Sequence, residues 1–153
     1  MRTLVALLIA ATLATPALAE DVQVKTPLGQ TITGHKIASP PAGSVEGTII
    51  ASIDLITAGK FDEWMKSYCH PSYCPDDAAA REAMKSYNLT ASSKTAGACL
   101  QDDGKSVIVT RQDGDPAKDS KVTTYLFCGE KRMPTPATLE KVGDTWRVSS
   151  FSW

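Results

Sequence analysis

The spacing of apolar residues changes partway along the chain, and this change restricts the fold more than any other feature. Between residues 44 and 87, apolar residues recur at steps of three and four, as they do on one face of an α-helix. After residue 88 they follow the pattern of β-strands separated by turns. Helices followed by a run of strands with short connections predict an α+β domain with an antiparallel sheet.

Three helices are expected in the first of these segments. The first begins at Ser44 and ends at Gly59, residue types that are favoured at helix N-caps and C-caps. The second covers residues 60–68, and the third covers residues 77–87 with Asp76 as its cap. Four large residues of the second helix share one face: Phe61, Trp64, Met65 and Tyr68.

Five strands are expected after the helices, with hairpin signals at residues 102–104 and at Gly143-Asp144. Their ranges are 95–101, 105–112, 121–130, 137–142 and 145–153. Residues 20–37 also alternate in the manner of a strand around a turn at residues 27–29, which predicts a small hairpin or an edge arm. We therefore expect an arm or hairpin and linker over residues 20–43, followed by one α+β domain over residues 44–153.

The N-terminus has the composition of a secretory signal peptide. Arg2 is followed by an apolar run, a proline at residue 16, and the small-x-small triplet that ends at Ala19. We expect a bacterial Sec-type signal over residues 1–19, cleavage after Ala19, and a periplasmic or secreted mature protein. The apolar run is shorter than the roughly 20 residues that span a bilayer, so no membrane attachment is expected after cleavage.

The mature chain would have 134 residues, which is 153 minus 19 and the size of one ordinary domain. Removing the signal removes one cation, so the 15 remaining Lys and Arg oppose 17 Asp and Glu, a net charge of −2. Charges of both signs are interspersed along the chain. This balance gives no electrostatic basis for a nucleic-acid partner.

An even set of cysteines in an exported chain predicts two disulfide bonds. The four are Cys69, Cys74, Cys99 and Cys128. We favour pairing Cys69 with Cys74 and Cys99 with Cys128, because prolines already bend the segment SYCHPSYCP over residues 67–75; a crossed pairing is the alternative. Adjacent Cys69 and His70 do not suit a single zinc ion, and the strings CxxC and CxxCH do not occur. No metal or cofactor is expected.

The segment GKFDEW after a helix, and the final hairpin ATLEKVGDTWRVSSF, resemble the nuclear transport factor 2-like (SnoaL-like) superfamily, which includes small exported bacterial members. The resemblance covers residues 44–153. It implies a cone-shaped α+β fold in which three N-terminal helices pack in a curved antiparallel sheet, often with a pocket at the open end. It also implies a homodimer through the outer sheet face. It implies no particular activity, because that fold carries isomerases, dehydratases and binding modules.

A pocket at the open end would be lined by aromatic residues with one polar contact, although core packing is the favoured explanation for the aromatic residues of the helices. The candidate ligand-binding residues are Trp64, Tyr68, Tyr125, Phe127 and Arg147. The strand at residues 121–128 is apolar on both faces, which indicates an association surface.

These features favour a non-catalytic exported binding module for a small apolar ligand or a protein partner. One alternative is a cavity enzyme of the isomerase or lyase type, which needs an inward carboxylate or histidine. The groups available for such a role are Asp54, Asp62, Glu63, His70, Glu130 and Glu140. A second alternative is an inhibitor of another secreted protein. The sequence contains none of the GxSxG, HExxH, phosphate-binding or dinucleotide motifs.

Overall fold

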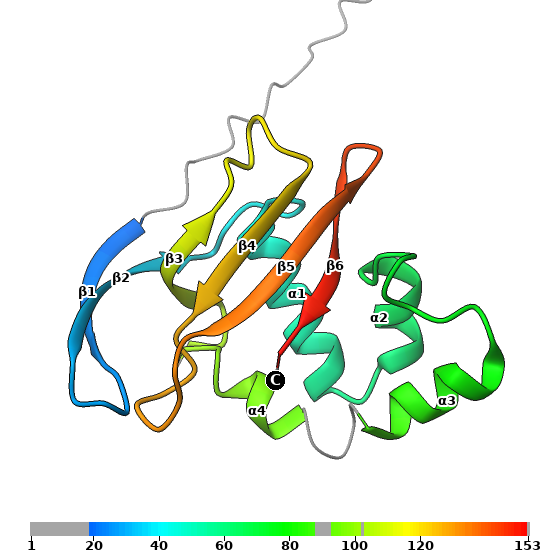
Figure 1. Ribbon diagram of the computed structural model, residues 1–153, viewed down its shortest axis with the longest axis horizontal. Helices are drawn as coiled ribbons and strands as arrows, with labels where there is room; N and C mark the ends of the chain where they lie inside the picture. Colours follow the sequence, from blue (N-terminus) through cyan, green and yellow to red (C-terminus); the bar gives the residue numbers. More distant parts are fainter. Residues whose placement is uncertain (1–18, 88–92, 102, 153) are drawn as a thin grey trace, which may run out of the picture.

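A single antiparallel sheet, with its six strands in chain order, dominates the fold (Figure 1). The computed structural model describes residues 19–87, 93–101 and 103–152. The strands are β1 (Ala19–Lys25), β2 (Thr31–Ala38), β3 (Ser106–Asp113), β4 (Lys121–Leu126), β5 (Thr135–Val142) and β6 (Thr145–Phe151). The helices lie between β2 and β3 in the chain, and are α1 (Val45–Thr57), α2 (Phe61–Ser67), α3 (Ala78–Tyr87) and α4 (Ser93–Gly97).

The expected cone with three N-terminal helices is wrong. Two strands precede the helices, and β2 pairs with β3, with Lys36 opposite Ile108. Residues 20–37, expected to form a small hairpin or an edge arm, form the β1–β2 hairpin, which lies at the edge of the main sheet. The alternating sequence of this segment predicts its strands correctly, but it does not show which other strand of the sheet they pair with. The fold is dominated by its sheet, with four short helices between β2 and β3.

Among the described helices, α1 packs against β3 and β6 through a continuous buried stripe. Its residues Ile49 and Ile53 are fully buried, and they belong to the same apolar cluster as Leu126, Leu139 and Val148 of the sheet. Burial of each such side chain stabilises the fold by about 1.5–3 kcal/mol. In contrast, α3 buries none of its residues.

The ends of α1 and α3 follow local capping rules. The backbone N–H of Gly47 donates to the Ser44 side chain at 3.0 Å, and Gly59, with a φ of +72°, follows the C-terminus of α1. At α3, Asp77 rather than the expected Asp76 caps the helix, since it accepts from the N–H groups of Ala79 and Ala80 at 3.0 and 2.8 Å. Residues 95–101, expected to form a strand, instead form the end of α4 and a single bridge from Leu100 to Val107.

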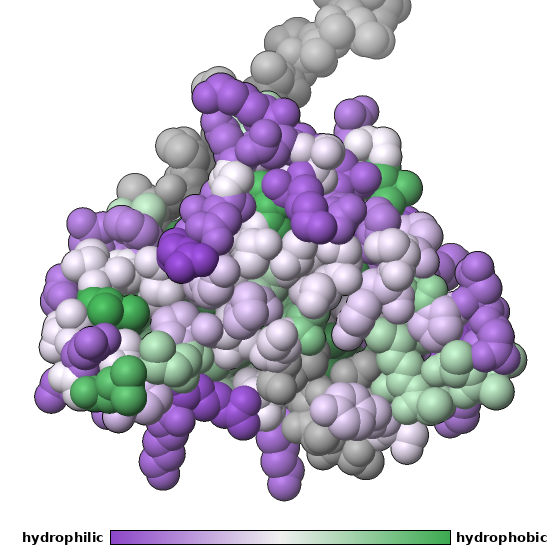
Figure 2. Space-filling model, in the orientation of Figure 1, coloured by the Kyte–Doolittle hydropathy of each residue, from purple (hydrophilic) through white to green (hydrophobic). Residues whose placement is uncertain are grey.

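The face of the sheet turned away from α1 is polar in its centre. Along β4, Val122, Thr124 and Leu126 are buried, and the residues between them lie on this outer face. There, the Thr123 and Thr138 hydroxyls are 3.0 Å apart, and Lys121 contacts Glu140 at 3.1 Å. Figure 2, which shows this face over β4 and β5, accordingly has pale to purple colours across its middle.

The expected signal peptide lies outside the described residues, except for Ala19 at the start of β1. Within the part of the chain that the structure describes, no helix is long and apolar enough to cross a membrane.

Candidate functional site

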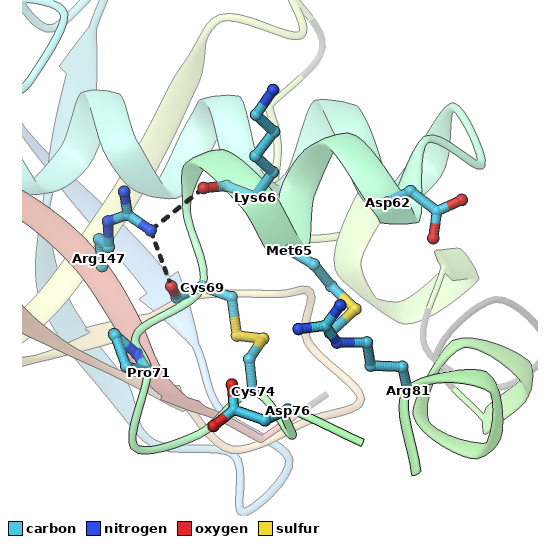
Figure 3. A pocket seen from close by; sticks show the side chains of 9 residues that line it. All are labelled: Asp62, Met65, Lys66, Cys69, Pro71, Cys74, Asp76, Arg81 and Arg147. Atoms are coloured by element: carbon cyan, nitrogen blue, oxygen red, sulfur yellow. Dashed lines mark hydrogen bonds between the residues drawn. A yellow bond between two sulfur atoms is a disulfide. The ribbon is translucent and has the colours of Figure 1, made fainter. Parts of the chain in front are cut away.

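A cleft of about 420 Å³ lies between α2, α3 and β6, beside the Cys69–Cys74 disulfide (Figure 3). We call it the disulfide cleft. Its lining residues are Asp62, Met65, Lys66, Cys69, Pro71, Cys74, Asp76, Arg81 and Arg147. The volume falls within the range of about 300–1,000 Å³ that is typical of small-molecule sites.

The wall of the cleft is formed where the chain leaves α2 and runs along the edge of the sheet. Cys69 forms a parallel bridge with Val148 of β6. The N–H of Val148 donates to Tyr68 O at 2.7 Å, and the N–H of His70 donates to Val148 O at 2.8 Å. The chain then turns, with the N–H of Cys74 donating to His70 O at 3.0 Å, and the disulfide joins Cys74 back to Cys69. The segment over residues 68–74 therefore covers the middle of β6.

Arg147 extends from β6 into this junction. Its Nη1 donates to the carbonyl oxygens of Lys66 at 3.2 Å and Cys69 at 3.3 Å, which the C-terminal end of α2 leaves without helical partners (Figure 3). Its Nε is buried and has no partner among the described residues. Buried N–H groups of a charged side chain are normally paired, so this guanidinium retains hydrogen-bonding capacity beside the cleft.

Arg81 approaches the cleft from α3. Its Nε donates to Pro75 O at 2.8 Å. Figure 3 shows its guanidinium beside the Met65 side chain and the disulfide. The two Nη atoms make no hydrogen bond to the described residues that line the cleft, and the side chain is exposed to solvent. Arg81 therefore presents a planar set of donors over an apolar surface of sulfur and methylene groups.

Positive charge exceeds negative charge in the disulfide cleft. Lys66, Arg81 and Arg147 oppose two carboxylates, Asp62 and Asp76. Asp62 is already paired with Lys85 of α3, with 3.2 Å between Lys85 Nζ and Asp62 Oδ2. Asp76 has no ion pair among the described residues, so the three cations of the cleft face one carboxylate that is not already paired. This excess of positive charge gives the cleft a local preference for anions.

The structure does not bring the five predicted ligand-binding residues together. Arg147 lines the disulfide cleft, whereas Trp64 is 1% exposed and packs against Phe61 with ring centroids 5.2 Å apart. Tyr68 faces a separate hollow of about 270 Å³ that is shared with Trp146.

Tyr125 and Phe127 lie on the outer face of the sheet, away from α1. The guanidinium carbon of Arg111 lies 4.0 Å from the centre of the Tyr125 ring, a cation–π contact. Tyr125 also lines a shallow hollow of about 380 Å³ with Ile32 and Met133. This hollow is separate from the disulfide cleft.

The ionisable groups considered for catalysis lie at the surface. Lys121 lowers the pKa of the Glu140 carboxyl through a hydrogen bond, and partial burial raises the pKa of Asp54. His70 Nδ1 lies 2.7 Å from the Ser72 hydroxyl. In the described part of the chain, the buried polar residues are all serine or threonine: Thr26, Thr48, Ser52, Ser106, Thr124 and Thr135.

Sequence reasoning missed Lys66 and Arg81 as members of the site. The favoured Cys69–Cys74 pairing could have indicated that these two residues lie close together. A disulfide that folds this loop back must bring the last turn of α2 close to the first turns of α3, and both residues lie there. Comparison with family models, curated proteins and solved structures finds no match for this chain.

Proposed function

We propose that this protein is an exported, non-catalytic binding module that holds a small organic anion in the disulfide cleft. The observation that carries the proposal is the placement of two guanidinium groups, Arg81 and Arg147, on one cavity. Guanidinium groups bind carboxylates through paired, charge-assisted hydrogen bonds. Met65, Pro71 and the disulfide add apolar walls, so the ligand that fits best has a carboxylate and a compact apolar body.

Export is supported by the two disulfides, which join Cys69 to Cys74 and Cys99 to Cys128, as favoured from the sequence. Disulfides of this kind persist in oxidising compartments. The finer parts of the proposal are a periplasmic or secreted location and cleavage of the signal after Ala19. Cell fractionation tests the location, and the intact mass of the exported protein tests the cleavage, because it shows whether the chain begins at Glu20.

A binding role has more support than catalysis because the described residues bury no carboxylate and no imidazole. A general base that works at neutral pH needs an environment that adjusts its pKa. The disulfide cleft instead offers fixed hydrogen-bond donors and apolar contacts, which suit recognition.

Isothermal titration calorimetry with matched ligand pairs tests the proposal. Hexanoate and benzoate are compared with hexanamide and benzamide, which keep the shape and remove the charge. We expect the carboxylates to bind at least tenfold more tightly, because a hydrogen bond to a charged group contributes about 1.5–3 kcal/mol. Equal affinity for acid and amide, or no binding of either acid, would contradict the proposal.

The variant Arg81→Gln tests the site itself, since Arg81 is exposed and its loss leaves the contacts of Arg147 in place. We expect at least tenfold weaker carboxylate binding. The control is Lys94→Gln, which removes an exposed cation on α4 that does not line the cleft. Inorganic phosphate is titrated separately; if it binds as tightly as the organic acids, the apolar part of the recognition is wrong.

A further inference from the structure

The two edges of the sheet differ in a way that bears on assembly. The β6 edge is covered at Val148 by the backbone of residues 68–70. The β1 edge lies at the margin of the molecule, and β1 pairs only with β2 within the described part of the chain (Figure 1). An open edge strand presents a row of N–H and C=O groups that another strand can bind.

The hydrogen bonding of the adjacent turn shows which residues of β1 have their backbone groups facing outward. The N–H of Thr26 donates to Gln30 O at 2.9 Å, so the backbone of Thr26 faces β2. Backbone direction alternates along a strand, so that of Val22 and Val24 also faces β2. The N–H and C=O groups of Asp21, Gln23 and Lys25 therefore face away from the sheet.

The side chains of β1 are sorted between two faces. Val24 lies opposite Ile32, and Val22 lies opposite Gly34. A Cβ on Gly34 would meet the side chain of Ile108, which is on the outer face because its neighbours Val107 and Val109 belong to the core cluster. Val22 and Val24 thus belong to the apolar end of the outer face. Asp21, Gln23 and Lys25 project from the opposite side, where Asp21 Oδ1 lies 2.7 Å from His35 Nδ1.

We propose that β1 pairs with β1 of a second copy, antiparallel and centred on Gln23, so that two sheets become continuous. In a two-fold pair of this kind, facing residues must lie on the same side of the sheet. Centring on Gln23 sets Asp21 opposite Lys25 of the second copy, twice, and Val22 opposite Val24, also twice. Centring on Val22 instead would set the charged Glu20 opposite Val24. The strand is therefore complementary to itself in charge and in hydrophobicity in one register.

In this register, the backbone N–H and C=O groups that face away from β2 form hydrogen bonds with those of the second copy. Gln23 faces its own symmetry copy, and the two Asp21–Lys25 pairs flank it, which gives three pairs whose backbone groups face one another. Each such pair exchanges two hydrogen bonds, so the interface would contain about six. The apolar ends of the two outer faces become neighbours across the two-fold axis. The exposed Leu28 of each copy lies on the turn that follows β1.

Charge reversal provides the test, with native mass spectrometry and analytical ultracentrifugation of the exported protein as the measurements. Asp21→Lys places two lysines opposite one another across the interface, and Lys25→Asp places two aspartates there. We expect each single variant to raise the dimer dissociation constant at least tenfold. The double variant D21K/K25D restores both ion pairs and should bring the constant back to within about threefold of the original.

The most decisive experiment mixes the two single variants. Asp21→Lys supplies only cations at these positions and Lys25→Asp supplies only anions, so the mixture should form heterodimers while each variant alone stays monomeric. Lys131→Asp, an exposed charge reversal on the β4–β5 loop, is the control and should leave the dimer intact. Circular dichroism and thermal unfolding of each variant verify that the monomer remains folded.

Three results would overturn the proposal. A wild-type protein that stays monomeric at 100 μM and above has no such interface. A dimer that survives both single variants pairs elsewhere. Single variants that fail to form heterodimers on mixing show that Asp21 and Lys25 do not face one another. Hydrogen exchange adds an independent measurement, because the amides of Asp21, Gln23 and Lys25 should become protected in the dimer.

Discussion

Removing the Cys99–Cys128 disulfide should destabilise the protein more than removing Cys69–Cys74. The first closes a loop of 30 residues, a sequence separation of 29, and the second closes a loop of six, a separation of five. On the chain-entropy model, the bonds stabilise the fold by about 3.6 and about 2.2 kcal/mol, a difference of about 1.4 kcal/mol that depends only on the loop lengths.

These energies convert into expected shifts in the melting temperature. Unfolding of the 134 residues after Ala19 carries an entropy of about 0.28 kcal/mol/K, from about 2.1 cal/mol/K for each residue. The variant C99A/C128A should therefore melt about 13 °C below the wild type, and C69A/C74A about 8 °C below it. Alanine is the replacement because Cys99, Cys128 and Cys69 are buried, and serine would add a buried hydroxyl.

Thermal and urea unfolding, followed by circular dichroism, measure both variants against the oxidised wild type. Wild type treated with dithiothreitol should lose about the sum of the two effects. The reasoning fails if C69A/C74A is destabilised as much as C99A/C128A or more. That result would mean that the short loop stabilises mainly through its native contacts with β6 and the disulfide cleft, and not through the unfolded chain.

Three further predictions concern single residues. Ser44→Ala should cost about 1 kcal/mol in urea unfolding, because the N–H of Gly47 loses its side-chain acceptor. Ile53→Ala should cost about 2–5 kcal/mol, since Ile53 is fully buried, whereas Leu28→Ala, at a side chain 73% exposed, should change the free energy of unfolding by less than about 0.5 kcal/mol. A hydrogen bond from Lys121 lowers the pKa of Glu140 in the folded protein. The stability that this pair contributes is therefore present above the ordinary glutamate pKa and is lost as the pH falls through the lower folded-state pKa. In Glu140→Gln, the midpoint of urea unfolding should depend less on pH in this range.

The elements with strong local signals were predictable from the sequence. The stripe of α1 and its cap at Ser44 appear where periodicity and capping place them. The hairpin of β5 and β6 forms around Gly143, with Val142 opposite Thr145. The disulfide pairing follows from the bend in residues 67–75.

The place of β1 and β2 was not predictable, because strand alternation shows that a strand forms and not where it pairs. Strand β2 pairs with β3 across the whole helical segment, with Lys36 opposite Ile108, and Gly34 lies close to the Ile108 side chain. A Cβ on residue 34 would lie 2.5 Å from Ile108 Cγ2, so glycine permits this approach of two strands. Nothing near Gly34 in the sequence indicates that requirement.

The disulfide cleft was only partly predictable for the same reason. Arg147 was identified as a polar contact, but Trp64 lies in the core, Tyr68 faces a separate hollow beside Trp146, and Tyr125 and Phe127 lie on the far face. Arg81 joins Arg147 at the cleft because the Cys69–Val148 bridge sets the loop against β6 and the Cys69–Cys74 disulfide folds that loop back before α3. Helical spacing alone also could not separate the buried Trp64 from a pocket aromatic.

The β6 edge is covered at Val148, so the two edges of the sheet differ in their capacity to pair with another strand. A subunit that is open at both edges has two attachment points and can propagate into fibres, whereas a subunit with one closed edge has a single attachment point. In this protein the backbone of residues 68–70 occupies the second point, and the Cys69–Cys74 disulfide holds it there. If β1 pairs with a second copy as proposed, this small disulfide loop would stop the joined sheet from extending further across Val148 at the β6 edge.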